Sequence, residues 1–193
     1  MRFVRHPELE GRHAILSASK GSWIRYDDDK IIERIKAQMS ASLGTDLHNL
    51  AAEAIRLKRR FPDTQDTLNM YVNDAIDLKM TPEQPLIASP YAFGTADAIS
   101  FRVEKPDEKP ILRIHDLKNG VHRVTMDQLL IYSAFFCLEY HVKPHEIDIE
   151  LRIYQNNYQM VYIPDPEDVL HIMDHTVFAS QLIEKTKMEA EDE

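Results

Sequence analysis

Residues 86–118 read LIASPYAFGTADAISFRVEKPDEKPILRIHDLK, and this stretch decides the fold. Its two outer parts, Leu86 to Val103 and Ile111 to Leu117, are rich in the β-branched and aromatic residues that are typical of strands. The charged segment EKPDEKP between them contains proline and predicts a turn. We therefore expect an antiparallel hairpin that brings residues from its two strands side by side.

The chain before this hairpin predicts helices. Three aspartates, residues 27–29, precede IIERIKAQM, and carboxylates at a helix start satisfy its free N–H groups and its dipole. Gly44-Thr45 precede a second predicted helix over residues 46–61, whose apolar stripe is stopped by Pro62. A third, weaker helix is predicted over residues 64–78.

The chain after the hairpin continues the alternation of helix and strand. Residues 125–140 are almost wholly apolar and predict a helix that is buried on most sides. Residues 147–155 alternate apolar and polar side chains, and they predict a second hairpin with residues 158–163. Pro166 opens a final amphipathic helix. This order predicts an α/β fold with one mixed sheet and helices on both of its faces.

The length of 193 residues suits one domain with a real core, so we expect a single domain over residues 1–193. Within it, residues 1–14 are expected to form an irregular arm, and residues 186–193 are expected to form a disordered acidic tail. No apolar run is long enough to cross a bilayer, and the N-terminus lacks the apolar region of a signal peptide. We therefore expect no contact with a membrane.

The charge and the cysteine content narrow the possible functions. The single cysteine, Cys137, excludes an intramolecular disulfide and any four-cysteine zinc or iron–sulfur site within one chain. This composition fits a reducing cytoplasm. The net charge of −9 is not the usual footprint of a passive nucleic-acid binder. It remains compatible with an enzyme that meets nucleic acid through a basic strip and a bound cation.

Three polar residues of the first hairpin are candidates for chemistry. Side chains alternate across a strand, so Asp116 and Lys118 share a face while Leu117 points to the core. The hairpin brings Asp97 beside this pair. A hard divalent cation would relieve the repulsion of the two carboxylates, and a cation, a water and an ammonium group together suit phosphodiester hydrolysis. The plain alternative is a surface ion pair at a hairpin end, next to the Asn119-Gly120 turn signal.

An ordered set of motifs resembles a known family. The segments are, in chain order, LSAS (16–19), GTDLH (44–48), GTAD (94–97), DLK (116–118) and QLLIY (128–132). Each motif is weak alone, but order and spacing agree over about residues 13–140. In this ordered set the sequence resembles the RecB-type, lambda-exonuclease-like branch of the PD-(D/E)XK nuclease superfamily, which includes CRISPR-associated adaptation nucleases and phage recombination-cassette nucleases.

The resemblance implies a three-layer α/β/α, restriction-endonuclease-like core and a set of roles. It implies that Mg²⁺ or Mn²⁺ is ligated, that a lysine positions or activates the attacking water, and that a glutamine and a tyrosine contact DNA near the scissile phosphate or orient the lysine. The implied metal ligands are His48, Asp97, Asp116 and the Leu117 carbonyl; the lysine is Lys118, and the other two residues are Gln128 and Tyr132. An imidazole ligand would favour Mn²⁺ slightly over Mg²⁺.

Two departures from the family pattern are visible. Ala96 stands where the family name has proline, and the four cysteines of many RecB-type nucleases are absent. The resemblance therefore implies a nuclease without an iron–sulfur cluster. It further implies exonuclease rather than endonuclease action on DNA duplex ends or single strands, in phage-like recombination or DNA processing in a bacterial or phage-infected cytoplasm. A recombination partner protein is implied in the same way, and the apolar helix 125–140 permits a homo-oligomer.

Several alternatives stay open at this stage. One alternative is a catalytically silent DNA-binding or assembly protein on the same fold, and another is an enzyme that cleaves RNA or a different phosphodiester. For His48 the alternative is an ordinary half-exposed histidine, and for Tyr132 it is plain core packing. Thr125 and Gln128 have the spacing of a capping box, which would give Gln128 a structural role.

Further residues are candidates for DNA contacts or for ordinary packing. Arg59 lies eleven residues after His48, nearly on the same face of a helix, so a phosphate-binding strip could lead to the metal; a solvated helix end is the alternative. His171 and His175 are expected on a helix surface, and His115 is expected on the face opposite Asp116. The candidates for DNA contact are Ser17, Ser19, Arg56, Arg59, His122 and Arg123.

Overall fold

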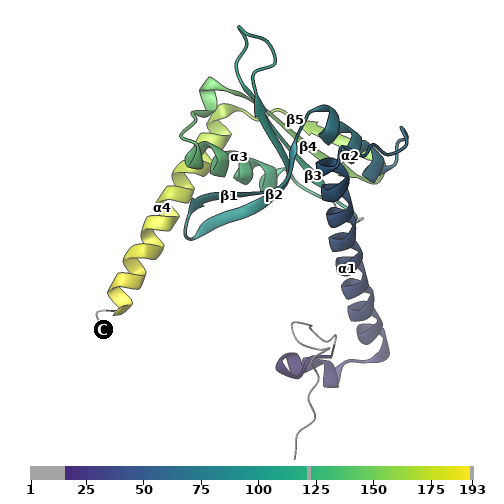
Figure 1. Cartoon of the computed structure of the whole chain (residues 1–193). Coiled ribbons are helices and arrows are strands. Elements are labelled where there is room, and N and C mark those ends of the chain that lie inside the picture. Colours follow the sequence, from purple (N-terminus) through teal and green to yellow (C-terminus); the bar gives the residue numbers. More distant parts are fainter. Residues whose placement is uncertain (1–15, 121–122, 192–193) are drawn as a thin grey trace, which may run out of the picture. The chain divides into compact units, whose positions relative to one another are not determined.

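The computed structural model describes residues 16–120 and 123–191 (Figure 1). The chain divides after Asp46 into two compact units. The first contains the 3₁₀ helix η2 (Ala18–Arg25) and the beginning of helix α1 (Asp28–Arg56). The Asp27 carboxylate accepts a hydrogen bond from the Lys30 N–H at 2.9 Å, which confirms the predicted role of the aspartates at this helix start. The expected arm, residues 1–14, lies outside the described residues.

Helix α1 is longer than predicted and runs through Gly44-Thr45 without a break. The prediction of two separate helices in this region is therefore wrong. A single glycine costs a helix only about 1 kcal/mol, and the Thr45 hydroxyl donates to the Ala41 carbonyl inside the helix at 3.2 Å. The helix also ends at Arg56 rather than at Phe61. It closes through Lys58 in the left-handed region (φ 52°), with the Arg59 N–H donating to the Ala54 carbonyl at 2.8 Å.

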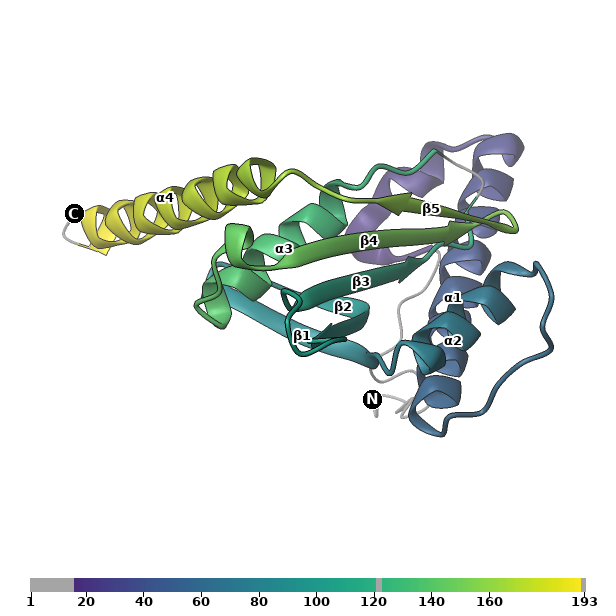
Figure 2. The same ribbon diagram turned by 90° about the horizontal axis from the view of Figure 1, so that it is seen from above.

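The second unit is built on a five-stranded sheet with the order β1-β2-β3-β4-β5 (Figure 2). Strands β3 and β4 are parallel and every other neighbouring pair is antiparallel, so the predicted mixed sheet is confirmed. Both predicted hairpins are present. The predicted strand 86–103 is two strands joined by a turn at Pro90-Tyr91. The bounds are β1 Thr81–Ser89, β2 Ala92–Arg102, β3 Ile111–Leu117, β4 Asp148–Gln155 and β5 Tyr158–Tyr162.

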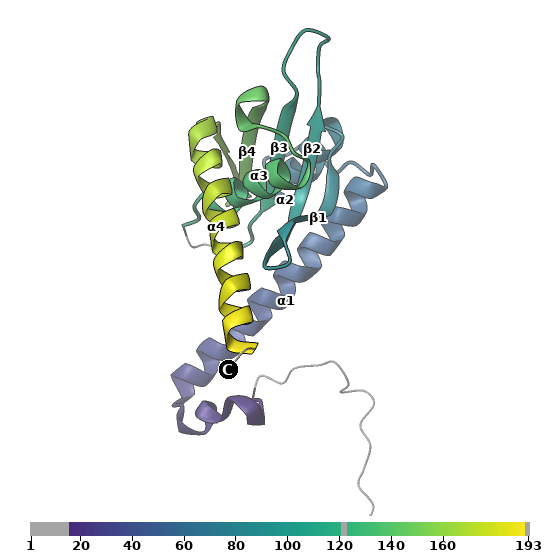
Figure 3. The same ribbon diagram turned by 90° about the vertical axis from the view of Figure 1, so that its left-hand side faces the viewer.

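Helices cover both faces of this sheet (Figures 2 and 3). Helix α2 (Thr67–Asp77) and the last turns of α1 form one apolar cluster with the sheet, and its buried residues include Tyr71 and Leu117. Helices α3 (Asp127–Glu139) and α4 (Pro166–Glu191) pack on the other cluster, which contains Cys137. The α/β class with helices on both faces, and the burial of Cys137, are thus confirmed.

The alternation of strand β2 breaks at Asp97. Ala96 packs in the cluster under α3, whereas Ala98 packs in the cluster under α2, although residues two apart in a regular strand share a face. Pro82 pairs with Ala98 and Gln84 with Ala96, so Glu83 lies opposite Asp97. Glu83 has a φ of 52°, which is strained for a residue other than glycine. The irregular backbone therefore sits where two carboxylates face each other.

Helix α4 continues further than the sequence predicted. Residues 186–191 are helical, so the prediction of a disordered tail from residue 186 is wrong for them. Met, Glu and Ala are good helix formers, and Lys185 and Glu189 form an i, i+4 pair at 3.7 Å. Among the described helices, none is both long enough and apolar enough to span a membrane.

Candidate active site

His48 of helix α1 and Asp97, in the middle of strand β2, meet beside Leu117 at the end of strand β3. The His48 Nδ1 lies 3.3 Å from Asp97 Oδ2, and the same oxygen accepts a hydrogen bond from the Leu117 N–H at 3.0 Å. The Asp97 side chain is only 13% exposed. The hydrogen bond to Asp97 raises the pKa of His48, helped by the charge of Asp97 and by a backbone hydrogen bond with Leu117, and opposed by burial. Two side chains of the ligand set that the resemblance implied therefore lie together, next to the Leu117 backbone.

A third side chain, Glu83 of β1, joins this pair and was missed from the sequence. Ligand atoms of His48, Glu83 and Asp97 all lie within 4.8 Å of one another. Burial raises the pKa of Glu83, and the charge of Asp97 raises it further. The missing signal was the Pro90-Tyr91 turn: once residues 86–103 are divided there, the segment around Glu83 becomes a strand paired with Asp97.

Asp116 lies next to this cluster and is almost fully buried, with 3% of the residue exposed. Its Oδ1 accepts a hydrogen bond from the Lys118 Nζ at 2.9 Å, whereas its buried Oδ2 has no hydrogen-bond partner among the described residues. Burial raises the pKa of Asp116, and the charge of Asp97 adds to the shift. An unpartnered carboxylate oxygen inside a protein is costly. The donor set around Asp97 and Asp116, oxygens plus one imidazole, fits a divalent cation.

Lys118 is held by a chain of polar contacts that reaches helix α3. Its Nζ donates to Asp116 and, at 2.9 Å, to Gln128 Oε1. The Gln128 Nε2 in turn donates to the Tyr132 hydroxyl at 3.3 Å. The capping interpretation of Gln128 is wrong, because the N-cap of α3 is Met126 and the Thr125 hydroxyl donates to Asp127 instead. Gln128 thus contacts the lysine directly and Tyr132 contacts Gln128, whereas the roles that the resemblance implied for both stay a prediction.

A second residue that the sequence did not indicate is Tyr71 of α2. Its ring is buried and packs edge-on against Tyr154, with centroids 5.5 Å apart. Burial raises the pKa of Tyr71, and the charges of Asp97, Asp116 and Glu83 raise it further. The Tyr71 side chain therefore lies close enough to these three carboxylates to be affected by their charges.

The predicted DNA-contact residues differ in what the structure says of them. Arg56 is exposed, and its positive charge opposes the rise in the pKa of Glu83. It therefore lies near the carboxylate cluster. Arg59 lies beyond the end of α1, and its predicted place on the helix face of His48 is wrong. Arg123 is exposed, and His122 lies outside the described residues. Ser17 and Ser19 belong to the first unit, and their DNA contact stays a prediction.

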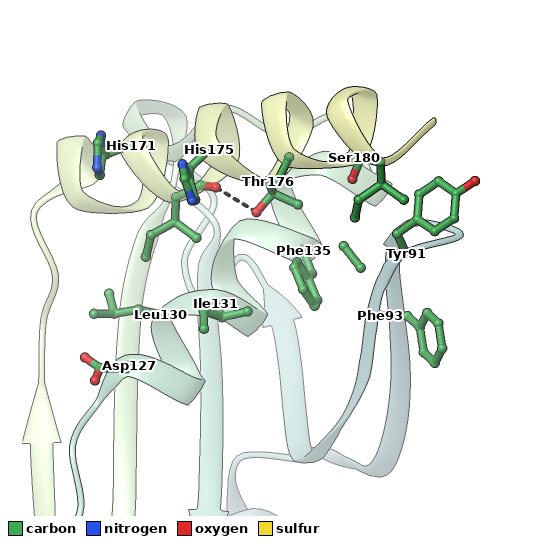
Figure 4. Close-up of a pocket in the computed structure, with 14 residues that line it drawn as sticks. Tyr91, Phe93, Asp127, Leu130, Ile131, Phe135, His171, His175, Thr176 and Ser180 are labelled. Atoms are coloured by element: carbon green, nitrogen blue, oxygen red, sulfur yellow. Dashed lines mark hydrogen bonds between the residues drawn. The ribbon is translucent and has the colours of Figure 1, made fainter. Parts of the chain in front are cut away.

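A separate apolar groove of about 580 Å³ lies between α3, α4 and the turn before β2 (Figure 4). His171 and His175 of α4 border it, and both are exposed, as predicted for a helix surface. Across the described residues, the only metal-ligand cluster is the one at Asp97, so these histidines form none. His115 is buried on the α2 side of the sheet beside Tyr154, which confirms that it points away from Asp116.

Comparisons with known proteins add little to this geometry. No family model matches the sequence, and no curated protein does. A solved structure with some likeness is the crystal structure of SSO0001, with a TM-score of 0.36 and 15% sequence identity; the match covers 81% of this chain and 69% of that one. A likeness at this level carries no argument about fold family or function.

Proposed function

We propose that this chain is a metal-dependent nuclease that hydrolyses DNA phosphodiester bonds, on a restriction-endonuclease-like core of the RecB-type branch of the PD-(D/E)XK superfamily. The observation that carries the proposal is the convergence of His48, Glu83 and Asp97, with the buried Asp116 close enough for its charge to interact with Asp97. Such a cluster has a physical reason to exist when a doubly charged cation offsets its repulsion.

The residues that would hold Mg²⁺ or Mn²⁺ are His48, Asp97, Asp116 and the Leu117 carbonyl, with Glu83 as an added ligand. When bound, such a cation lowers the pKa of a water and stabilises charge on a phosphoryl oxygen. The histidine must be neutral to ligate it, so metal binding competes with the proton that Asp97 favours on His48.

Lys118 supplies the second positive charge of the proposed reaction. Its ammonium is fixed between Asp116 and Gln128, and 30% of its side chain is exposed, so it can also reach a water or a phosphate oxygen. An ammonium held in place by two acceptors loses little further freedom when it donates to the reacting groups. Lys118 is thus the residue that would orient the attacking water or neutralise the phosphate.

The rest of the proposal follows from the resemblance. We favour an exonuclease acting on duplex ends or single strands in phage-like DNA recombination or processing, with a recombination partner protein and a homo-oligomer as further expectations. An acidic chain can bind DNA when local cations meet the phosphates. Arg56, whose charge acts on Glu83, and the exposed Arg123 are the predicted DNA-contact cations that we assign to this role.

A cleavage assay tests the proposal. The substrates are linear duplex DNA, nicked circular DNA, single-stranded DNA and RNA, each with Mg²⁺, Mn²⁺ or EDTA. We expect cation-dependent DNA cleavage that Lys118→Ala reduces by roughly 10²-fold or more. The matched control is Lys143→Ala, because Lys143 is 77% exposed and forms an ion pair with the exposed Glu146. Undiminished cleavage by Lys118→Ala would falsify the mechanism.

The same substrates separate the alternatives. Binding of DNA without cleavage of any substrate would favour a catalytically silent DNA-binding or assembly protein. Cleavage of RNA alone would favour a ribonuclease. Release of products only from linear ends would support the exonuclease assignment over an endonuclease.

A further inference from the structure

Gly94 of β2 lies against the ring of Tyr132. A Cβ atom at Gly94 would lie 2.8 Å from Tyr132 Cε1 and 3.3 Å from the Tyr132 hydroxyl oxygen. The first distance is shorter than Cβ atoms tolerate, so the ring fills the space that any other side chain would need. The φ of Gly94 lies outside the left-handed region, so its backbone conformation does not require glycine. The close approach of the ring is the reason for a glycine here.

The Tyr132 ring begins the chain of contacts that ends at Lys118. An amide has one donor end and one acceptor end, so Gln128 can offer Oε1 to Lys118 only when Nε2 points the other way. That end of the amide donates to the Tyr132 hydroxyl at 3.3 Å. The Tyr132 ring is held on another side by Phe135, with centroids 6.5 Å apart and an edge-on arrangement. The ammonium can only donate, so it requires Oε1 to face it, and the Tyr132 hydroxyl then holds the Nε2 end of the amide in place.

We propose that Gly94 is a positioning residue for Lys118. By leaving room for the Tyr132 ring, it sets the Gln128 amide, and the amide sets the Lys118 ammonium 2.9 Å from Asp116. The effect on catalysis rests on the proposed nuclease function, whereas the packing of Gly94 against Tyr132 does not.

Protein stability tests the packing step without any reference to cleavage. In an ordinary strand, Gly→Ala stabilises a protein by reducing the entropy of the unfolded chain. At Gly94 we expect the opposite: Gly94→Ala lowers the urea unfolding midpoint. In the Tyr132→Ala background the same change should raise the midpoint or leave it unchanged, because the space is then empty. Gly21→Ala is the control, since a Cβ there meets nothing within 4 Å.

A double-mutant cycle gives the decisive number. If Gly94→Ala changes the midpoint equally in both backgrounds, the two residues are not coupled and the inference is wrong. If Gly94→Ala alone does not fold, the double variant Gly94→Ala, Tyr132→Ala must fold for the inference to hold.

The positioning step has a separate kinetic readout. We expect Gly94→Ala to lower kcat by roughly 10²-fold, the cost of misplacing a catalytic group by about 1 Å, with KM nearly unchanged. Tyr132→Phe keeps the ring but loses the hydroxyl, so it should lower kcat without the loss of stability. In the Tyr132→Ala background Gly94→Ala should have no further effect on kcat.

The two readouts distinguish failure of this inference from failure of the proposed function. If the stability cycle shows coupling but the protein cleaves no substrate, the nuclease proposal is wrong and the inferred packing of Gly94 against Tyr132 stands. An active nuclease in which Gly94→Ala lowers stability but leaves kcat intact would overturn the positioning role alone.

Discussion

At the scale of single residues, the molecule concentrates acidic groups where burial makes their charge costly. Burial raises the pKa of both Glu83 and Asp116, and repulsion by the charge of Asp97 raises each further. The folded chain therefore favours the protonated form of each more than the unfolded chain does. Their contribution to folding stability is therefore present at low pH and is lost as the pH rises through the raised values. At neutral pH a bound divalent cation would offset this repulsion and restore the folding stability that the repulsion removes.

Glu83→Gln tests the residue that the sequence did not indicate. Without divalent ions the variant should be at least as stable as the natural chain at neutral pH, because it removes a disfavoured charge. A saturating cation, at about 100 times its dissociation constant, stabilises a folded protein by roughly 2.7 kcal/mol. We expect Glu83→Gln to lose most of the Mn²⁺-induced rise in melting temperature. Glu53→Gln, at an exposed position on α1, should keep that rise; equal rises in both variants would remove Glu83 from the site.

His115 predicts how the protein responds to acid. Burial, aided by the charges of Arg152 and Arg113, holds the pKa of His115 well below its usual value. The unfolded chain protonates this histidine near pH 6.5, so the stability present above that pH falls as the pH drops below it. We expect His115→Phe to lose less stability between about pH 7.5 and about pH 5 than the natural chain. Urea unfolding at both pH values measures this, and the exposed His171→Gln should behave like the natural chain.

At the scale of elements, the sequence predicted those helices and strands that are specified by local sequence patterns. The hairpin of β2 and β3, the alternation of β4 and the apolar α3 were predictable, because periodicity and turn residues specify them. Two features depended on tertiary context. Gly44 has a weak local preference that the long helix α1 overrides. The place of Glu83 in the site could not be predicted, because it depends on the pairing of β1 with β2, which puts Glu83 opposite Asp97.

The end of α1 gives a prediction at this scale. Lys58 adopts a φ of 52°, a conformation that costs a residue with a Cβ roughly 1–2 kcal/mol and costs glycine almost nothing. We expect Lys58→Gly to raise the free energy of unfolding by about 0.5–1 kcal/mol, after allowance for the greater freedom of glycine in the unfolded chain. Leu57→Gly, one residue earlier, should lower it. Urea unfolding compares the two; a loss of stability in Lys58→Gly would contradict the left-handed helix end.

At the scale of the whole molecule, the net charge of −9 makes any contact with DNA a local matter. The candidate active site gathers the carboxylates and one lysine between the middle of β2 and the end of β3, so a cation there would change the local charge where a phosphate would arrive. Metal binding, folding stability and cleavage are therefore expected to depend on one another.

The most direct test is a crystal structure of the full chain grown with Mn²⁺ and measured at the manganese absorption edge. We predict an anomalous peak at about 2.0–2.3 Å from the Asp97 and Asp116 carboxylates, with His48 as a further ligand. A peak that is absent from this cluster under saturating Mn²⁺, with His48, Glu83 and Asp97 still in mutual contact, would contradict the account.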